Sequence, residues 1–329
     1  MKRRAIRLIP LLLLLLVTAC AASIPGAERT VTNSSPGTAD EPPALAAVHL
    51  AAGEKLRVVA DTTLIGDVVT QIGGDAIQLT VLLDPGADPH SYQATPEDLR
   101  AIDDAHLIFV NGLGLEESLG PILGDARAKT VSVNMGVKTI AAAASEDVDH
   151  RGGVNPHTWW SLAAVEQWTR NIADSLTAVD PDRGAQYTAN AAAYRAQLQN
   201  LGVELDGLVA RVPPAQRKLA TDHDTLAYFA RDFGFQIIGL VVPSFSTQAE
   251  PSAQHLAALQ NQIRDADVQV ILVGSTVNPR LAERLAQDMG IRVIPIFTDS
   301  LSAAGGPAPS YVEFMRYNVT VIVNALLGK

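Results

Sequence analysis

Short apolar runs alternate with helical patterns along most of the chain after residue 54. The runs over 56–60 and 77–83 have the length of strands, and the segment 62–73 between them repeats its apolar residues at helical spacing. The same alternation returns between residues 218 and 297. Strands that alternate with helices form parallel sheets covered by helices. We therefore expect an α/β fold of two lobes, each with a parallel sheet flanked by helices.

A different pattern lies between the two halves. Asp180-Pro181 is followed, up to Pro213-Pro214, by apolar residues at steps of three and four: Tyr187, Ala191, Tyr194, Leu198, Leu201, Leu205 and Leu208. A helix over 181–212 would be about 45 Å long at 1.5 Å per residue. We expect this one long rigid helix, within a linking segment 181–213, to join an N-terminal lobe at 55–180 to a C-terminal lobe at 214–329.

The first twenty residues have the features of a secretion signal. A basic start with Lys2, Arg3, Arg4 and Arg7 precedes an apolar stretch over 8–17 that is too short to span a bilayer. That stretch ends in Val-Thr-Ala-Cys, which resembles the lipobox of bacterial lipoproteins. We expect residues 1–20 to be a lipoprotein signal peptide and Cys20 to be lipidated, which would anchor the protein in the cell membrane on its periplasmic or outer face. The alternative is an incidental cysteine in a signal that is cut elsewhere.

Composition narrows the function. Residues 21–54 are rich in Ala, Ser, Thr, Pro and Gly, so we expect a flexible tether there. Cys20 is the only cysteine in the chain, so a metal site in the folded part must use His, Asp or Glu. The net charge of −10 argues against a nucleic-acid partner. We expect a monomer.

Four potential metal ligands fall in predicted strand-to-helix connections. His90 comes after the run 77–83, His157 lies in Asn-Pro-His, His223 follows the run 218–221, and Asp299 follows the run 291–297. In open α/β sheets, ligands bind beyond the carboxyl ends of the strands. Three imidazoles and one carboxylate could make a four-coordinate site for a divalent ion. These residues form no local motif, so their spacing alone leaves a shared site undecided.

A resemblance supports the shared site. It rests on the stretches DPHSYQATPEDL, VNGLGLE, NPHTWW, TDHDTLAYFA, STQAEPS and FTDSL, followed by GGP and SYVEFMRYN. In these blocks the chain resembles the solute-binding lipoproteins of zinc and manganese ABC importers. The resemblance implies two α/β lobes that clamp a metal in the cleft between them, with His90, His157, His223 and Asp299 as ligands. It also implies a binding protein rather than an enzyme, with an importer permease and its ATPase as partners.

The chain departs from that family in two places. The family commonly has Asp-Pro-His and then Trp-Leu-Asp-Pro around the second histidine, where this chain has Asn155 and then Trp160-Ser161. The long His-rich loop of many zinc members is missing, and residues 139–154 contain a single His150. His at the third ligand position, His223, favours Zn²⁺, whereas the missing loop favours Mn²⁺. We expect zinc, with manganese as the alternative.

Two other functions explain the sequence less well. A metallohydrolase would need an open coordination position and a general base, and no His-Glu-x-x-His stretch occurs. A siderophore, haem or cobalamin carrier would leave four converging ligands unexplained. For His106 we expect a structural role, and for His49, His150 and His255 solvated positions. Trp159, Trp160 and Tyr228 are expected either to shield the site or to pack in the core.

Overall fold

Two parallel four-stranded sheets organise the described part of the chain, which in this computed structural model comprises residues 43–141 and 153–329. The first sheet has the strand order β2(Ile77–Val81)-β1(Leu56–Ala60)-β3(Leu107–Val110)-β4(Thr130–Ser132). The second has the equivalent order β6(Gln236–Leu240)-β5(Lys218–Thr221)-β7(Val270–Gly274)-β8(Arg292–Ile296). All pairings are parallel, with Leu56 opposite Ile77 and Val270 opposite Arg292. The predicted α/β fold with two lobes is confirmed.

Helices connect the strands and begin and end at residues that suit those positions. The helices of the two lobes are α1(Thr63–Gly73), α2(Pro96–Asp104), α3(Gly120–Asp125), α6(Ala227–Phe233), α7(Ala253–Asp265), α8(Arg280–Met289) and α9(Tyr311–Leu326). Thr95 caps α2 in a reciprocal capping box with Asp98. Gly234 ends α6 in the left-handed region at φ 70°, a conformation in which a side chain would be strained.

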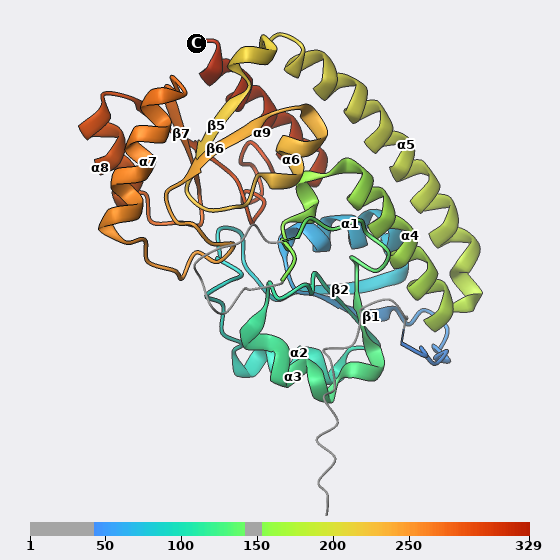
Figure 1. The fold of residues 1–329 in the computed structure, drawn as a ribbon. Coiled ribbons are helices and arrows are strands. Elements are labelled where there is room, and N and C mark those ends of the chain that lie inside the picture. The colour runs from blue at the N-terminus through green and yellow to red at the C-terminus, as the bar shows by residue number, and fades with distance from the viewer. Residues whose placement is uncertain (1–42, 142–152) are drawn as a thin grey trace, which may run out of the picture. The chain divides into compact units, whose positions relative to one another are not determined.

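The long helix predicted between the lobes is α5(Gly184–Val209), and a 3-10 turn over Pro181–Arg183 precedes it. It is shorter than predicted at both ends, because the chain after Asp180-Pro181 first makes this tighter turn and Val209 is the last helical residue before Pro213. The helix contacts α1 and α9, and so it packs against both lobes (Figure 1). Its stripe of apolar residues is buried from Tyr187 to Leu205.

A second long helix, α4(Leu162–Val179), was not among the predicted helices. It packs along α5 (Figure 1) and buries Val165, Trp168, Ile172, Leu176 and Val179. These residues recur at steps of three and four, so the helical signal was present in the sequence. Helices α4 and α5 therefore form a packed helix pair beside the lobes.

The two lobes share one apolar core. A single cluster of buried residues extends from Leu56 and Phe109 to Leu219 and Phe314. Trp160 lies in that cluster, with its ring centroid 5.0 Å from that of Phe314 and 5.9 Å from that of Phe229. Because protein interiors are closely packed and resist deformation, a core that continues across both lobes opposes a wide hinge motion.

The described chain starts inside the segment predicted as a tether. Residues 43–54 are not detached from the fold: Leu45, Val48 and Leu50 pack partly buried against the core, and the Val48 N–H donates to the carbonyl of Val179 at 2.8 Å. The folded unit therefore begins earlier than residue 55. The expected signal peptide, Cys20 and residues 21–42 of the tether lie outside the described residues. Among the helices that the structure describes, none is long and apolar enough to cross a bilayer.

Candidate metal centre

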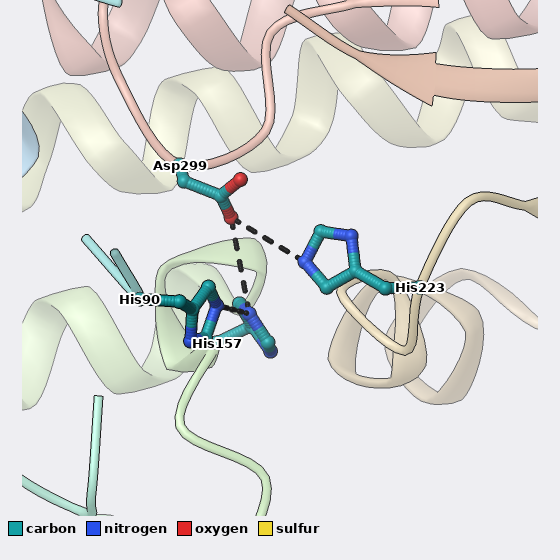
Figure 2. Close-up of side chains that lie close together, drawn as sticks. All are labelled: His90, His157, His223 and Asp299. Atoms are coloured by element: carbon teal, nitrogen blue, oxygen red, sulfur yellow. Dashed lines mark hydrogen bonds and ion pairs between the residues drawn. The ribbon is translucent and has the colours of Figure 1, made fainter. Parts of the chain in front are cut away.

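The four predicted ligands come together although they are far apart in sequence. One ligand atom from each of His90, His157, His223 and Asp299 lies within 4.8 Å of the others. Figure 2 shows the three imidazoles and the carboxylate pointing toward one another from separate loops. Within residues 43–141 and 153–329, this is the one group of three or more His, Cys, Asp or Glu side chains that could hold a single ion. His90 is partly exposed and the other three are buried.

The loop between β2 and α2 presents His90. Oδ1 of Asp88 accepts a hydrogen bond from the main-chain N–H of His90 at 3.0 Å, and Oδ2 accepts from the hydroxyl of Ser91 at 3.1 Å. The same Oδ2 accepts from the hydroxyl of Thr247, in the C-terminal lobe, at 2.6 Å. Asp88 therefore shapes the turn that holds His90 and also ties that turn to the opposite lobe.

His157 sits at the start of a 3-10 turn over Thr158–Trp160. The main-chain oxygen of Pro156 accepts from Nδ2 of Asn111 at 3.1 Å, which fixes the loop to the end of β3. Nδ1 of His157 lies 2.9 Å from Oδ1 of Asn155. Because an amide oxygen can only accept, Nδ1 carries the proton, and the lone pair of Nε2 in the neutral ring faces the other ligands.

His223 follows β5 and is held by its neighbour Asp222. Nδ1 of His223 lies 3.0 Å from Oδ1 of Asp222, whose other oxygen accepts from the N–H of Gly274 at 2.7 Å. A carboxylate behind a metal-ligating imidazole fixes the ring orientation and raises its basicity. Nε2 of His223 is thereby directed toward Asp299.

Asp299 follows β8 and uses only one of its oxygens within the protein. Oδ2 accepts from the hydroxyls of Thr276 and Thr298, at 2.8 and 2.7 Å. Oδ1 lies 3.8 Å from Nε2 of His157 and 3.8 Å from Nε2 of His223 (Figure 2). The indole Nε1 of Trp159 donates to the main-chain oxygen of Thr298 at 2.7 Å, so the turn that carries His157 also supports the loop that carries Asp299.

Burial and charge give the two enclosed imidazoles opposite acid–base behaviour. Burial, together with the charges of His223 and His90, lowers the pKa of His157 well below 6.5. Burial would also lower the pKa of His223, but the carboxylates of Asp222 and Asp299 outweigh it and raise that pKa to about 9. Burial raises the pKa of Asp299, against the opposing effect of His223.

The donor set suits one divalent ion. In a tetrahedral shell with bonds of about 2.0–2.1 Å, ligand atoms are about 3.3 Å apart. The Nε2 atoms of His90 and His157 are 3.2 Å apart, and the two distances to Oδ1 of Asp299 are 3.8 Å each. Among the described residues, Nε2 of His223 and Oδ1 of Asp299 are the buried side-chain atoms without a hydrogen-bond partner. Buried polar atoms are normally satisfied, and both of these atoms point at the centre of the cluster.

The remaining predicted residues lie away from the cluster or support it. His106 pairs through both ring nitrogens with Arg57, at 3.1 and 2.7 Å, as expected of a structural histidine. His255 lies 2.8 Å from the main-chain oxygen of Leu240, and His49 is exposed. The positions predicted either to shield the site or to pack in the core, Trp159, Trp160 and Tyr228, are all buried. His150 lies outside the described residues.

Sequence reasoning missed several supporting residues. Asp88, Thr247, Thr276 and Asp222 each bond to a ligand or to its loop. The bonds of Thr247 to Asp88 and of Thr276 to Asp299 join separate segments of the chain. Asp222 could have been found from the sequence, because a carboxylate beside a ligating histidine is a recurrent pairing. Thr276 and Thr247 carry no such signal.

Comparison with known proteins identifies the family. Over residues 58–325 the chain matches the family described as "Zinc-uptake complex component A periplasmic", and it belongs to that family. The manganese-binding lipoprotein MntA of Halalkalibacterium halodurans is 30% identical over 275 residues, which cover 83% of this chain and 89% of the relative. The manganese ABC transporter substrate-binding lipoprotein PsaA of Streptococcus pneumoniae is 29% identical over 283 residues, covering 83% and 90%.

Solved structures show the same fold. The periplasmic zinc-binding protein TroA from Treponema pallidum superposes with a TM-score of 0.75 at 28% identity, over 83% of this chain and 99% of that one. The Mn-bound periplasmic metal-binding protein from Candidatus Liberibacter asiaticus gives a TM-score of 0.74 at 31% identity, over 83% and 100%. Relatives in this family are named as substrate-binding proteins of ABC transporters, which confirms the prediction of a binding protein rather than an enzyme.

Proposed function

We propose that the protein captures a divalent transition metal outside the cytoplasmic membrane, between its two lobes, and delivers it to the permease of an ABC importer. One observation carries this proposal. Nε2 of His223 and Oδ1 of Asp299 are buried without a hydrogen-bond partner and lie within 4.8 Å of ligand atoms of two further imidazoles. Leaving polar atoms unsatisfied costs stability, and a bound cation would satisfy both of them.

Zinc is the ion that the donor set favours. Imidazole nitrogens suit Zn²⁺, which also lies above Mn²⁺ in the Irving–Williams order, whereas Mn²⁺ favours a larger share of oxygen ligands. This chain offers three imidazoles and one carboxylate. Manganese is the alternative, because several relatives are named as manganese-binding and one solved neighbour holds Mn.

A chelator-competition titration separates the two metals. Protein purified without added metal is titrated with Zn²⁺ and with Mn²⁺ against chelators of known affinity at pH 7.5. The proposal expects one ion per chain and tighter binding of zinc. Tighter binding of manganese would reverse the metal assignment, and no binding of either ion would end the proposal.

The fourth ligand argues against hydrolysis. Catalytic zinc sites keep three protein ligands and an open position for water, whereas Asp299 here supplies a fourth donor. A carrier of a siderophore, haem or cobalamin would not need four side chains aimed at one point. An assay for release of bound metal to a chelator, run alongside an assay for ester or amide hydrolysis, would distinguish transport from catalysis.

The location and partners form part of the same proposal. A lipid on Cys20 would hold the protein at the membrane beside the permease and its ATPase, with residues 21–42 as the spacer and the two lobes acting as a monomer. Cys20→Ser should then release the protein from the membrane fraction and leave metal binding unchanged. An unchanged membrane-bound fraction would show that the anchor lies elsewhere.

A further inference from the structure

A carboxamide links the loops of the two fully buried histidines, His157 and His223. Asn155 is fully buried and belongs to the loop that carries His157 in the N-terminal lobe. Its Oδ1 accepts from the main-chain N–H of His157 at 3.0 Å and from ring Nδ1 at 2.9 Å. Its Nδ2 donates to the main-chain oxygen of Asp224 at 2.7 Å. Asp224 directly follows His223, so one side chain contacts the loops of two ligands from opposite lobes.

The polarity of this amide is fixed by its partners. The main-chain N–H of His157 can only donate, and the carbonyl of Asp224 can only accept. Turning the amide over would place two donors together at His157 and two acceptors together at Asp224. The orientation therefore does not depend on the tautomer of His157 but determines it, because the ring must present an N–H to Oδ1.

The loop that holds Asn155 is itself anchored in the C-terminal lobe. The hydroxyl of Tyr228 donates to the main-chain oxygen of Asn155 at 2.7 Å and accepts from the N–H of Ile140 at 3.0 Å. Tyr228 lies on α6, which follows the loop of His223. The Asn155–Asp224 bond is thus the contact nearest the ligands in a small network that crosses between the lobes.

We propose that Asn155 is a positioning residue that holds the His157 and His223 loops together across the lobes and keeps His157 in the tautomer that ligates through Nε2. This proposal rests on the function proposed above. An amide can fill this role and a carboxylate cannot, since the role needs an acceptor toward His157 and a donor toward Asp224. Asp at this position would keep the first bond, lose the second and place a negative charge against a carbonyl oxygen.

Asn155→Asp is the decisive variant, because two effects oppose each other. A carboxylate would make His157 more basic and would add negative charge near the ion, so its electrostatic effect alone would tighten metal binding. The proposed positioning role predicts the reverse, a loss of about 10-fold or more in zinc affinity, as for other residues that support a ligand. Asn155→Ala, which loses both bonds, should bind at least as weakly as Asn155→Asp.

Asn190→Asp is the matched control. Nδ2 of Asn190 also donates to a main-chain oxygen, that of Ile72 at 2.9 Å, but it joins α5 to α1 and touches none of the four ligands. Wild type, Asn155→Asp, Asn155→Ala and Asn190→Asp are titrated with Zn²⁺ by chelator competition. Zinc affinity should fall in the two Asn155 variants and remain at the wild-type value in the control. If Asn155→Asp binds zinc as tightly as wild type or more tightly, the proposed positioning role of Asn155 is wrong.

Nuclear magnetic resonance of the wild type keeps the test independent of folding in the variants. The ¹⁵N shifts of the metal-free protein should show His157 protonated at Nδ1, and the side-chain amide of Asn155 should exchange slowly with solvent. A His157 ring protonated at Nε2 alone would also overturn the proposal. If wild type binds no metal, the proposed function fails instead, and the tautomer measurement still judges the positioning role.

Discussion

Oδ1 of Asp299 lies 3.8 Å from Nε2 of His223, and neither atom has a hydrogen-bond partner among the described residues. His223 follows β5 and Asp299 follows β8, and both side chains are buried. A buried pair held apart in this way, with His157 and His90 beside it, has the donor atoms and the spacing that a divalent cation would need.

Replacing His223 by Glu should weaken zinc binding about 10- to 100-fold and narrow the preference for zinc over manganese. The change exchanges a nitrogen donor for an oxygen donor, which suits manganese better, and places another carboxylate beside Asp222 and Asp299. Competition titrations with both metals measure the preference. His106→Gln is the control and should leave both affinities unchanged. If His223→Glu retains both wild-type affinities, His223 is not the ligand that selects zinc.

The pH dependence of zinc affinity should begin near pH 9. The carboxylates of Asp222 and Asp299 raise the pKa of His223 to about 9, so below that pH the metal must displace a proton from this ring. Affinity should therefore fall by up to tenfold for each pH unit below about 9 and stop rising above it. His157, whose pKa is lowered well below 6.5, should contribute only in acid.

Calorimetry in buffers of different ionisation enthalpy counts the protons released. One proton per zinc ion is expected at pH 7.5. Asp222→Asn removes the carboxylate that raises the pKa of His223. It should therefore reduce the number of protons released per zinc ion and lower the pH at which zinc affinity begins to fall. An affinity that is constant between pH 6.5 and 9 would contradict the protonation state assigned to His223.

Thr247→Val should speed metal release about fivefold. Its hydroxyl donates to Asp88, which holds the turn of His90, the ligand that is not fully buried. A hydrogen bond of this kind contributes about 1 kcal/mol, which corresponds to about a fivefold change. Stopped-flow transfer of zinc to a fluorescent chelator gives the release rate. Thr188→Val, which removes a hydroxyl bonded only within α5, should release zinc at the wild-type rate.

Glu116→Gln should stabilise the metal-free protein at neutral and higher pH. Burial and the adjacent Asp61 raise the pKa of Glu116 well above 4.5, so the folded state keeps a proton that the unfolded state loses. The free energy of unfolding of the wild type should fall by up to about 1.4 kcal/mol per pH unit from 4.5 up to the raised pKa. Glutamine is neutral and avoids that loss.

Urea denaturation of wild type and Glu116→Gln at pH 5 and pH 8 measures the difference. The increase in the free energy of unfolding of Glu116→Gln over wild type should be larger at pH 8 than at pH 5. A variant that is less stable than wild type at both values would show that Glu116 is ionised in the fold, sharing the N–H of Asn111 with Asp61 as a second carboxylate.

Local signals in the sequence were sufficient for most elements of the fold. Thr95, Pro96 and Asp98 are a recognisable start signal for α2, and Gly234 is a recognisable end signal for α6, because caps and left-handed turns depend on the residues that form them. Helix α4 was missed although its apolar residues recur at helical spacing. The packing of residues 43–54 was missed because most of their apolar residues are alanines, and the larger ones, Leu45, Val48 and Leu50, show no sustained period.

The sequence indicates each candidate ligand separately, but it does not show that the four side chains meet at one point. His90, His223 and Asp299 each follow a strand, which a single sequence can reveal, whereas His157 precedes a 3-10 turn without such a strand. The point at which the four meet depends on the strand order and on how the lobes pack together. The Asn155–Asp224 bond joins segments that are distant in the chain, and no local pattern indicates it. The prediction that the four residues form one site came from the resemblance to metal-binding lipoproteins, because their spacing along the chain could not show it.

Asp299→Asn provides the most direct test of the account. The substitution preserves the shape of the side chain and one acceptor oxygen but removes the charge that faces His157 and His223. Asp67→Asn is the matched control, since Asp67 bonds to Tyr311 and Tyr194 and to none of the four ligands. Zinc bound per chain and zinc affinity are measured by chelator competition at pH 7.5. We predict one zinc ion per chain in wild type and Asp67→Asn, and an affinity at least about 100-fold lower in Asp299→Asn, since even residues behind the ligands cost 10- to 100-fold. Wild-type affinity in Asp299→Asn would contradict a metal centre formed by these four residues.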